Sequence, residues 1–275
     1  MDMKKRIFTF WEPKDMLPGY ITCCLETWRR FLPDCELVIL DWQNLGQWLT
    51  ESEIHDVICR DMTLAMQSDC IRCAVLYRHG GIWMDADTIV TRPLDSCLLQ
   101  PGCVFVGRVE DDGRRVNYGA FISTDGPGSP FLKGWRDALV PRVAKSARFR
   151  RNPLLRVFRR AEWREIRKWD YCVNAIIDPL CNDERTMCDH RFVDSRMIGA
   201  MPELGDGSAL SGGATPKDLY QSFWFSEGDL RPSDTGGLLL LHNSWTPTEV
   251  RVMAREEFLN SGLRMARFVG QLLER

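Results

Sequence analysis

A single stretch, Ser68–Asp87, constrains the fold more than any other part of the chain. Before and within it, apolar residues from Thr63 to Tyr77 recur at three- and four-residue steps, which predicts a helix. Gly80 and Gly81 are typical of residues that end a helix. The apolar run Ile82–Met84 is short and bounded, as a fully buried strand would be. We therefore expect a helix, a tight turn and a buried strand in direct succession.

Two aspartates follow the predicted strand. Side chains alternate between the two faces of a strand, so Asp85 and Asp87 should lie on the same side. Two carboxylates that project together from a buried strand end repel each other unless something neutralises them. Oxygen ligands of this kind suit a hard divalent ion such as Mg²⁺ or Mn²⁺.

The preceding part of the chain supplies a second unit of the same type. Residues 6–10 and 36–40 are predicted strands, and residues 20–31 between them are a predicted helix. A strand–helix–strand unit with apolar strands indicates a parallel sheet and an α/β fold. No G-x-G-x-x-G follows the first strand and no G-x-x-x-x-G-K-[ST] is present, so a dinucleotide site and a P-loop are not supported.

The polar residues of the central stretch form a composite motif. Its members are Ser68-Asp69, Arg72, Gly80-Gly81 and Asp85-x-Asp87. This spacing resembles the signature of sugar transferases with a DxD motif. It is similar to glycosyltransferase family 32, to the related capsular polysaccharide synthesis proteins and to the glucosylating bacterial toxins. The resemblance implies a GT-A-like α/β fold with a mostly parallel central sheet flanked by helices, and we expect residues 1–275 to form one such domain.

The resemblance also implies roles for these residues. Asp87 is expected to be a direct metal ligand, and Asp85 to serve the metal and the ribose and sugar side of a nucleotide sugar. Asp69 and Arg72 are expected to hold the donor sugar and its phosphate, so catalysis would depend on Asp69, Arg72 and Asp85. The structural alternative is that the aspartate pair begins a turn before Thr88, and that Asp69 and Arg72 form a helix-surface ion pair.

Further candidates lie elsewhere in the chain. Trp11 follows the first strand and resembles the base-contacting aromatic of the capsular synthesis family, although core packing is an equal alternative. Asn117 falls where the resembling enzymes approach the donor sugar and acceptor, but a turn-forming asparagine is the preferred explanation. His242 ends a late apolar strand and is expected to be the third metal ligand, with a core histidine as the alternative. Ser244 and Trp245 would complete the pyrophosphate site.

A basic segment, residues 142–169, differs from the rest of the chain. It contains eleven arginines and lysines against two glutamates, a net charge of +9, so the remainder carries −11 of the total of −2. Apolar residues interleave with these charges, and Pro153 is suited to the first turn of a helix. The pattern predicts either a membrane-surface helix or a solvated helix whose apolar stripe packs on the domain. Nucleic acid binding is not expected, because no recognition fold accompanies the charge.

The cysteines and the hydropathy of the chain bear on its location. Eleven cysteines lack the spacing of a zinc site, which favours reduced, buried thiols in a cytoplasmic protein. No apolar run approaches the ~20 residues of a membrane span, and no signal peptide is evident. Residues 199–216 are rich in glycine, proline and serine and are expected to form a long loop. We expect a cytoplasmic protein that can lie peripherally at the inner face of the membrane.

The resemblance, together with the aspartate pair, implies a metal-dependent hexosyltransferase. The donor would be a nucleoside-diphosphate sugar bound with Mn²⁺ or Mg²⁺. The resemblance implies retention of anomeric configuration and an acceptor hydroxyl on a glycan or lipid-linked glycan of a capsule or lipopolysaccharide. Two alternatives stay open: a metal-dependent phosphodiesterase that uses the same aspartates, and a non-catalytic scaffold that binds a nucleotide sugar.

Overall fold

The computed structural model describes residues 5–186, 188–197, 215–230 and 237–274 of the chain. The strands are β1 (Lys5–Phe10), β2 (Cys35–Leu40), β3 (Gly81–Met84), β4 (Thr88–Val90), β5 (Cys103–Val109), β6 (Arg115–Thr124), β7 (His190–Asp194) and β8 (Leu238–Leu240). The α-helices are α1 (Gly19–Phe31), α2 (Glu51–Val57), α3 (Leu64–His79), α4 (Pro130–Arg151), α5 (Pro153–Phe158), α6 (Arg160–Ile166), α7 (Asn174–Cys181), α8 (Pro216–Phe225), α9 (Thr248–Val252), α10 (Arg255–Leu259) and α11 (Arg264–Glu274).

Six of the strands form one sheet in the order β2-β1-β3-β6-β5-β7. Strand β1 runs parallel to both β2 and β3, and β7 runs parallel to β5. Strand β6 is antiparallel to its neighbours β3 and β5. Strands β4 and β8 form a separate antiparallel pair. The sheet is therefore mixed but mostly parallel, and the predicted α/β class is confirmed.

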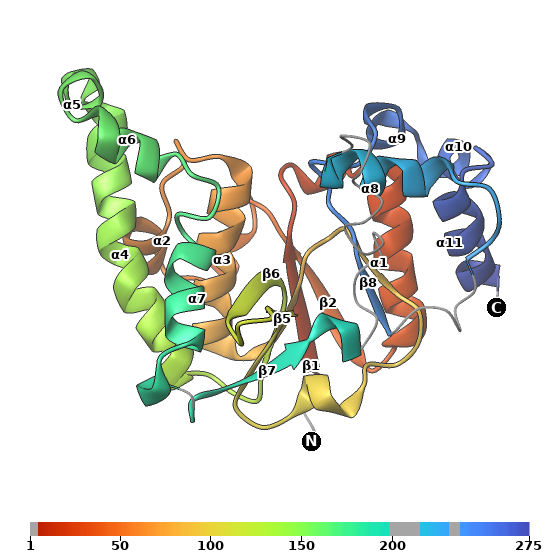
Figure 1. Cartoon of the computed structure of the whole chain (residues 1–275), viewed down its shortest axis with the longest axis horizontal. Helices are drawn as coiled ribbons and strands as arrows, with labels where there is room; N and C mark the ends of the chain where they lie inside the picture. Colours follow the sequence, from red (N-terminus) through yellow and green to blue (C-terminus); the bar gives the residue numbers. More distant parts are fainter. Residues whose placement is uncertain (1–4, 187, 198–214, 231–236, 275) are drawn as a thin grey trace.

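The helices cover both faces of this sheet. Figure 1 shows α2, α3, α4 and α7 on one side and α1, α8, α10 and α11 on the other. A hydrophobic cluster lies on each face of the sheet. Because successive side chains of a strand point to opposite faces, each strand can contribute residues to both clusters. In β3, Ile82 and Met84 belong to the cluster beneath α1, whereas Trp83 belongs to the cluster beneath α3. Burial on both faces explains why these strands are continuous apolar runs.

Helix α3 and strand β3 form as the sequence predicts. The Thr63 hydroxyl accepts a hydrogen bond from Met66 N (3.4 Å) and begins the helix. Gly80 ends it with φ +67°, a conformation that favours glycine. A Cβ at Gly80 would also lie 2.6 Å from the backbone of Gly126, so this turn needs glycine for two reasons. The tight turn leads directly into β3 and fixes where that strand ends.

Two predicted helices are divided in the structure. The apolar spacing of residues 249–273 predicts one amphipathic helix, but this stretch consists of α9, α10 and α11. Extended backbone at Met253 and Ala254 separates the first two, and Gly262 with φ +70° precedes the third. The basic segment is likewise not one helix: it begins within α4 and continues as α5 and α6, with a break at Asn152 (φ −121°, ψ 97°). Pro153 does open α5, as predicted.

Three other predictions concern the cysteines, membrane-spanning helices and the loop at residues 199–216. All eleven cysteines are free thiols and most are buried, in agreement with the sequence. Across the described ranges, no helix is both long enough and apolar enough to cross a membrane. The loop predicted at 199–216 falls almost entirely outside the described residues.

Candidate active site

A cavity of about 390 Å³ opens where β1 and β3 end. In an α/β sheet, ligands bind beyond the carboxyl ends of the strands, and this cavity occupies that position. Its wall combines residues from the end of β1, from α3, from the β3–β4 turn and from the segment after β8. Most of the predicted site residues meet here: Trp11, Asp69, Arg72, Asp85, Asp87, His242 and Ser244.

Arg72 organises the wall formed by α3. Its Nη2 lies 3.1 Å from Asp69 Oδ1 and 3.0 Å from Asp85 Oδ1, and its Nη1 donates to the carbonyl of Gly119. The arginine side chain is 6% exposed and that of Asp69 8%, so this ion pair is buried rather than on the helix surface. The alternative of a helix-surface ion pair is therefore wrong. The guanidinium holds together residues from α3, β6 and the end of β3.

Two neighbours hold Arg72 and Asp85 in position. The Arg72 guanidinium carbon lies 5.2 Å from the ring centroid of Trp83, and Trp83 Nε1 donates to Asp85 Oδ1 (2.8 Å). At Gly119, where φ is +70°, a Cβ would lie 2.5 Å from Arg72 Nη1. Glycine is therefore needed there both for its backbone conformation and for the close approach of the arginine.

Burial has the largest effect on the pKa of Asp69. Removal from water raises the pKa of its carboxyl group to about 7, and the negative charge of Asp85 acts in the same direction. The charge of Arg72 lowers the pKa but does not outweigh burial. Asp69 is therefore a carboxyl group that can accept or donate a hydrogen bond near neutral pH.

The two aspartates of the DxD motif lie in a turn, not on the strand. Strand β3 ends at Met84, and Thr88 N donates to Asp85 O (3.0 Å) to close the turn. Strand alternation therefore cannot explain where the two carboxylates lie, because neither aspartate belongs to β3. The two residues instead form a turn before Thr88, as the alternative described. Both aspartates nevertheless line the same cavity.

Asp87 is held by backbone groups. Its Oδ2 accepts a hydrogen bond from Asn243 N (2.6 Å), and the side chain of Asn243 accepts one from Tyr20 Oη (2.5 Å). Desolvation raises the pKa of Asp87, and the neighbouring charge of Asp85 raises it further. No side-chain cation within the described chain pairs with Asp87, so its negative charge is poorly compensated.

The segment after β8 brings His242, Ser244 and Trp245 to this region. His242 N donates to Tyr220 Oη (2.9 Å), and the His242 ring packs against Trp245 with centroids 4.6 Å apart. His242 and Ser244 line the cavity, but Trp245 does not and instead packs against the core. Desolvation lowers the pKa of His242, while the charge of Asp85 acts to raise it.

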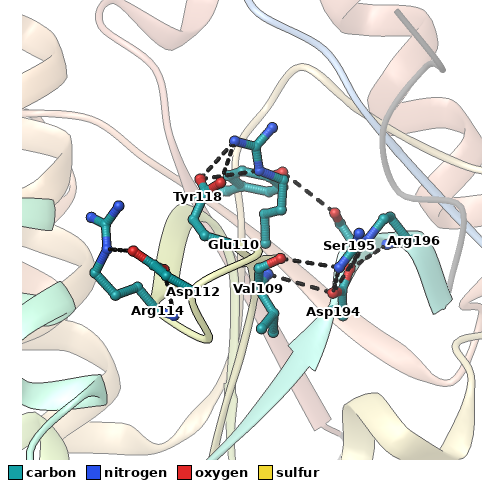
Figure 2. A network of polar contacts seen from close by, with 9 residues as sticks. Val109, Glu110, Asp112, Arg114, Tyr118, Asp194, Ser195 and Arg196 are labelled. Carbon is teal, nitrogen blue, oxygen red and sulfur yellow. Dashed lines mark hydrogen bonds and ion pairs between the residues drawn. The ribbon is translucent and has the colours of Figure 1, made fainter. Parts of the chain in front are cut away.

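Aromatic side chains line the rest of the cavity. Trp11 is half-buried there, and exposed Trp169 and half-buried Tyr118 contribute from other elements. Figure 2 shows Tyr118 within a polar network at the end of the β5–β6 hairpin, where Ser195 Oγ donates to its hydroxyl (3.4 Å). In the same network Asp194 accepts from Val109 N (3.4 Å), which ties this hairpin to β7. The aromatic lining gives the cavity surfaces on which a nucleobase or sugar ring can stack.

Asn117 does not line the cavity. It is 1% exposed in β6, and its side-chain oxygen accepts a hydrogen bond from Gly119 N. Its own N–H donates to Asp178 Oδ1 (2.9 Å), and its carbonyl accepts from Asn174. This arrangement corresponds to the turn-forming alternative, and the residue supports the site through Gly119, which Arg72 contacts.

The cavity lining has the charge balance expected of a cation site. Glu12, Asp69, Asp85 and Asp87 line it, whereas Arg72 is the one arginine or lysine among the described lining residues. The described chain has no group of three His, Cys, Asp or Glu side chains placed together to hold a metal. The set Asp85, Asp87 and His242 therefore stays a prediction. Mg²⁺ and Mn²⁺ are commonly bound by one or two carboxylates plus substrate phosphates, which these residues fit.

Several residues of the site escaped the sequence analysis. Asn243 and Tyr20 support Asp87, Trp83 donates to Asp85, and Gly119 accepts from Arg72. Asn243, Tyr20 and Gly119 act through a backbone group or a contact between residues distant in the sequence, which no local pattern signals. Trp83 lies only two residues from Asp85, but the sequence analysis placed it in the apolar strand and gave its indole no polar role. Tyr118 could have been predicted as a site residue, because it directly follows Asn117, which was already a candidate.

With the cavity described, comparison with known proteins identifies the class. Residues 1–149 match the family described as "Capsular polysaccharide synthesis protein", and the chain belongs to that family. This match includes β1, α3 and the Asp85–Asp87 turn. The resemblance to capsular polysaccharide synthesis proteins is thereby confirmed. No curated protein sequence matches the chain.

Solved structures give distant likenesses. A structure titled "PaToxG Glycosyltransferase" is 16% identical with a TM-score of 0.36, over 64% of this chain and 78% of that chain. A structure of a transferase carrying two cysteine-to-serine substitutions is 12% identical with a TM-score of 0.31, over 51% of this chain and 79% of that one. Another, "Structure of Transferase", is also 12% identical, with a TM-score of 0.29 over 50% and 78%. Likeness at this level carries no conclusion about activity.

Proposed function

We propose that this protein is a metal-dependent hexosyltransferase of surface polysaccharide synthesis. It would transfer a sugar from a nucleoside-diphosphate sugar to a hydroxyl of a glycan or lipid-linked glycan, at the cytoplasmic face of the membrane. Residues 1–275 would form one catalytic domain. The observation that carries the proposal is the cavity lining, which has four carboxyl groups, one arginine and several aromatic rings. An anionic donor enters such a cavity only with a compensating cation.

Different residues would bind different parts of the donor. Trp11 would stack on the nucleobase, and Asp85 and Asp87 would hold Mn²⁺ or Mg²⁺ against the diphosphate. Asp69 is close enough to Arg72 (3.1 Å) for the two to bind neighbouring groups of the donor sugar and its phosphate. Ser244 would contribute a hydroxyl to the pyrophosphate, and His242 would approach the same region.

The reaction breaks the bond between the anomeric carbon and the leaving phosphate oxygen. Positive charge develops on the sugar and negative charge on the departing nucleoside diphosphate. A bound divalent ion would neutralise the leaving group, and Arg72 would add a fixed positive charge in a partly desolvated site. We further propose retention of configuration: the acceptor hydroxyl would attack the anomeric carbon on the face that the diphosphate leaves, and its proton would pass to the departing phosphate oxygen. Nuclear magnetic resonance of the product anomer tests this, and an inverted product would contradict it.

The main experiment is an incubation with a panel of nucleotide sugars and Mn²⁺. A transferase releases nucleoside diphosphate slowly even without acceptor, because water replaces the acceptor hydroxyl. A phosphodiesterase releases nucleoside monophosphate, and a non-catalytic scaffold releases neither. Diphosphate from one donor, lost when Mn²⁺ is removed by a chelator, is the expected result.

A matched pair of variants links this activity to the cavity. Asp87→Asn preserves the shape of the side chain and can still accept the hydrogen bond from Asn243 N, but it removes the charge. Asp112→Asn removes an exposed carboxylate that pairs with Arg114 outside the cavity. Diphosphate release should fall steeply in the first variant only. Equal release from both variants would separate the activity from this cavity.

A further inference from the structure

The basic segment forms an arm at one end of the molecule. Helix α4 extends beyond the neighbouring helices, and α5 lies at its tip, with α6 leading back (Figure 1). The main packing partners of α5 are α4 and α6. The arm is held together by Trp163, whose ring stacks on Phe149 with centroids 6.2 Å apart and 2° between planes. The guanidinium groups of Arg150 and Arg156 lie 5.5 and 5.2 Å from the Trp163 ring. Contacts within the arm therefore hold its tip, while Arg150 also donates a hydrogen bond to the carbonyl of Asp61 in the body of the protein.

The tip of the arm exposes apolar side chains on one face. Leu154 is 64% exposed, Val157 54% and Phe158 80%. Their spacing of three and four residues puts them together on α5. These side chains do not pack on the body of the protein, so the prediction of a solvated helix with a packed apolar stripe is wrong for α5. Ile166 of α6 is buried and does follow that prediction.

Exposed arginines without an ion pair precede and follow this apolar tip in the chain. Arg148 and Arg151 lie at the end of α4, and Arg160 and Arg164 lie on α6, all exposed. None of these four forms an ion pair with a carboxylate of the described residues. By contrast, Arg159 pairs with Glu162. The tip therefore combines a bare apolar face with positive charges that no carboxylate in the described part of the chain neutralises.

We propose that this arm docks the protein on an anionic phospholipid surface. Leu154, Val157 and Phe158 would enter the boundary between headgroups and acyl chains, and the four unpaired arginines would contact lipid phosphates. Phospholipid is favoured over a purely ionic partner because the tip exposes three apolar side chains between two pairs of exposed, unpaired arginines in the sequence. The proposal deepens the proposed function and rests on it for its purpose, since a lipid-linked acceptor would be presented at the same surface.

Some residues that line the cavity follow the arm directly in the sequence. The segment that follows α6 carries Trp169, Val173 and Asn174, and all three line the cavity. The arm also projects at the same end of the molecule where β1 and β3 end and the cavity opens (Figure 1). Docking by α5 would therefore bring the cavity towards the membrane, within reach of an acceptor that cannot leave it.

The test measures sedimentation with vesicles and needs no activity. Wild-type protein should bind vesicles of phosphatidylglycerol and phosphatidylcholine, bind phosphatidylcholine alone weakly, and be released by high salt. A tip variant, Leu154→Ser, Val157→Ser and Phe158→Ser, should lose binding at low salt, where wild type binds. A charge variant with Arg148, Arg151, Arg160 and Arg164 changed to Gln should bind at least about a hundredfold more weakly, because each lost charge contributes about fivefold.

Matched controls remove the same chemistry elsewhere. Met16, Met197 and Val252 are 74%, 79% and 77% exposed, and their serine variants should bind like wild type. Phe158→Leu should retain binding, because it keeps an apolar side chain at the tip. Thermal unfolding of each variant establishes that the fold is intact before binding is compared.

The outcomes separate this proposal from the proposed function. Absence of wild-type binding, or binding that the tip variant retains, overturns the lipid proposal even if donor hydrolysis is found. Tight binding to soluble dextran sulfate by the tip variant as well as by wild type, without vesicle binding, would identify an anionic polymer as the partner instead. Vesicle binding with no activity on any nucleotide sugar would leave the docking surface intact and overturn the proposed function alone.

Discussion

On the α3 side of the cavity, Asp69 and Asp85 share one guanidinium, whereas on the β8 side Asp87 accepts a hydrogen bond from the backbone N–H of Asn243 and forms no ion pair within the described residues. The first wall is complete in the protein alone, because Arg72 compensates much of the charge that it buries. Burial raises the pKa of a carboxyl group on both walls, Asp69 on the first and Asp87 on the second, but among the described residues no cationic side chain pairs with Asp87. Under the proposed function, folding alone would complete the first wall, and a bound ligand would complete the second. Removing a charge should therefore have opposite consequences on the two walls.

The largest effect is expected for nucleotide binding by Asp87→Asn. Losing a supporting contact of a metal site costs about 10- to 100-fold, so losing a direct ligand should weaken Mn²⁺-dependent nucleotide affinity by about 100-fold or more. The free energy of unfolding should stay the same or rise, because the repulsion between Asp85 and Asp87 is removed. Calorimetric titration with nucleoside diphosphate and Mn²⁺ measures the affinity. Unchanged affinity would mean that Asp87 is not a metal ligand and that the two walls do not differ in this way.

Arg72→Ala should destabilise the protein, in contrast to Asp87→Asn. The variant leaves Asp69 buried without its cation and deprives Asp85 of the same partner. Breaking a buried ion pair by removing one partner costs about 3 kcal/mol or more. Urea denaturation measures this loss, and donor hydrolysis should fall as well.

Arg114→Ala provides the control for this variant. Arg114 is 69% exposed and pairs with Asp112, so its loss should change stability by less than about 1 kcal/mol. If Arg72→Ala were no more destabilising than Arg114→Ala, the α3 wall would not be a structure completed by folding.

A smaller loss of stability is expected for Asp69→Asn. Burial already raises the pKa of Asp69 to about 7, so a neutral amide of the same shape should cost only about 1 kcal/mol. Arg72 keeps its second partner, Asp85, in this variant. Turnover should nevertheless fall by about tenfold or more, because the amide presents a donor where the sugar needs an acceptor. Stability and the turnover of the donor are measured together, and a stability loss equal to that of Arg72→Ala would indicate a purely structural residue.

The α3 wall was largely predictable from the sequence, and the β8 wall was not. Helix α3, its glycine turn and β3 are specified by neighbouring residues, so Asp69, Arg72 and Asp85 were placed near one strand end. The position of Asp87 depends on Asn243, which lies 156 residues away, and no periodicity encodes that contact. The prediction from strand alternation failed because β3 ends at Met84, before both aspartates.

The arm shows a second limit of sequence patterns. The periodicity of the basic segment suggested one amphipathic helix, but it did not reveal the break at Asn152. That break turns α5 across the end of α4, and it leaves Leu154 and Phe158 exposed instead of packed. Whether an apolar residue in a charged helix is buried depends on where the chain reverses, which is set by contacts such as those of Trp163 with Phe149.

The smallest effect should come from His242, which sharpens the comparison within the β8 wall. Its backbone N–H, not its ring, makes the hydrogen bond to Tyr220, and the ring packs on Trp245. His242→Ala should therefore change the free energy of unfolding by about 0.5 kcal/mol or less. If the ring approaches the bound ion, Mn²⁺-nucleotide affinity should fall by about tenfold, well short of the loss in Asp87→Asn.

Titration of His242→Ala with nucleotide in the presence and absence of Mn²⁺ separates two roles for the ring. A loss seen only with Mn²⁺ supports a ring that serves the ion, whereas an equal loss without Mn²⁺ points to packing against the nucleotide itself. No loss in either condition would leave His242 as a residue of the cavity rim, with Asp85 and Asp87 as the only described side chains of the proposed metal set. In that case the diphosphate of the donor would have to supply more of the coordination, and the affinity of Mn²⁺ alone for the protein should be correspondingly weak.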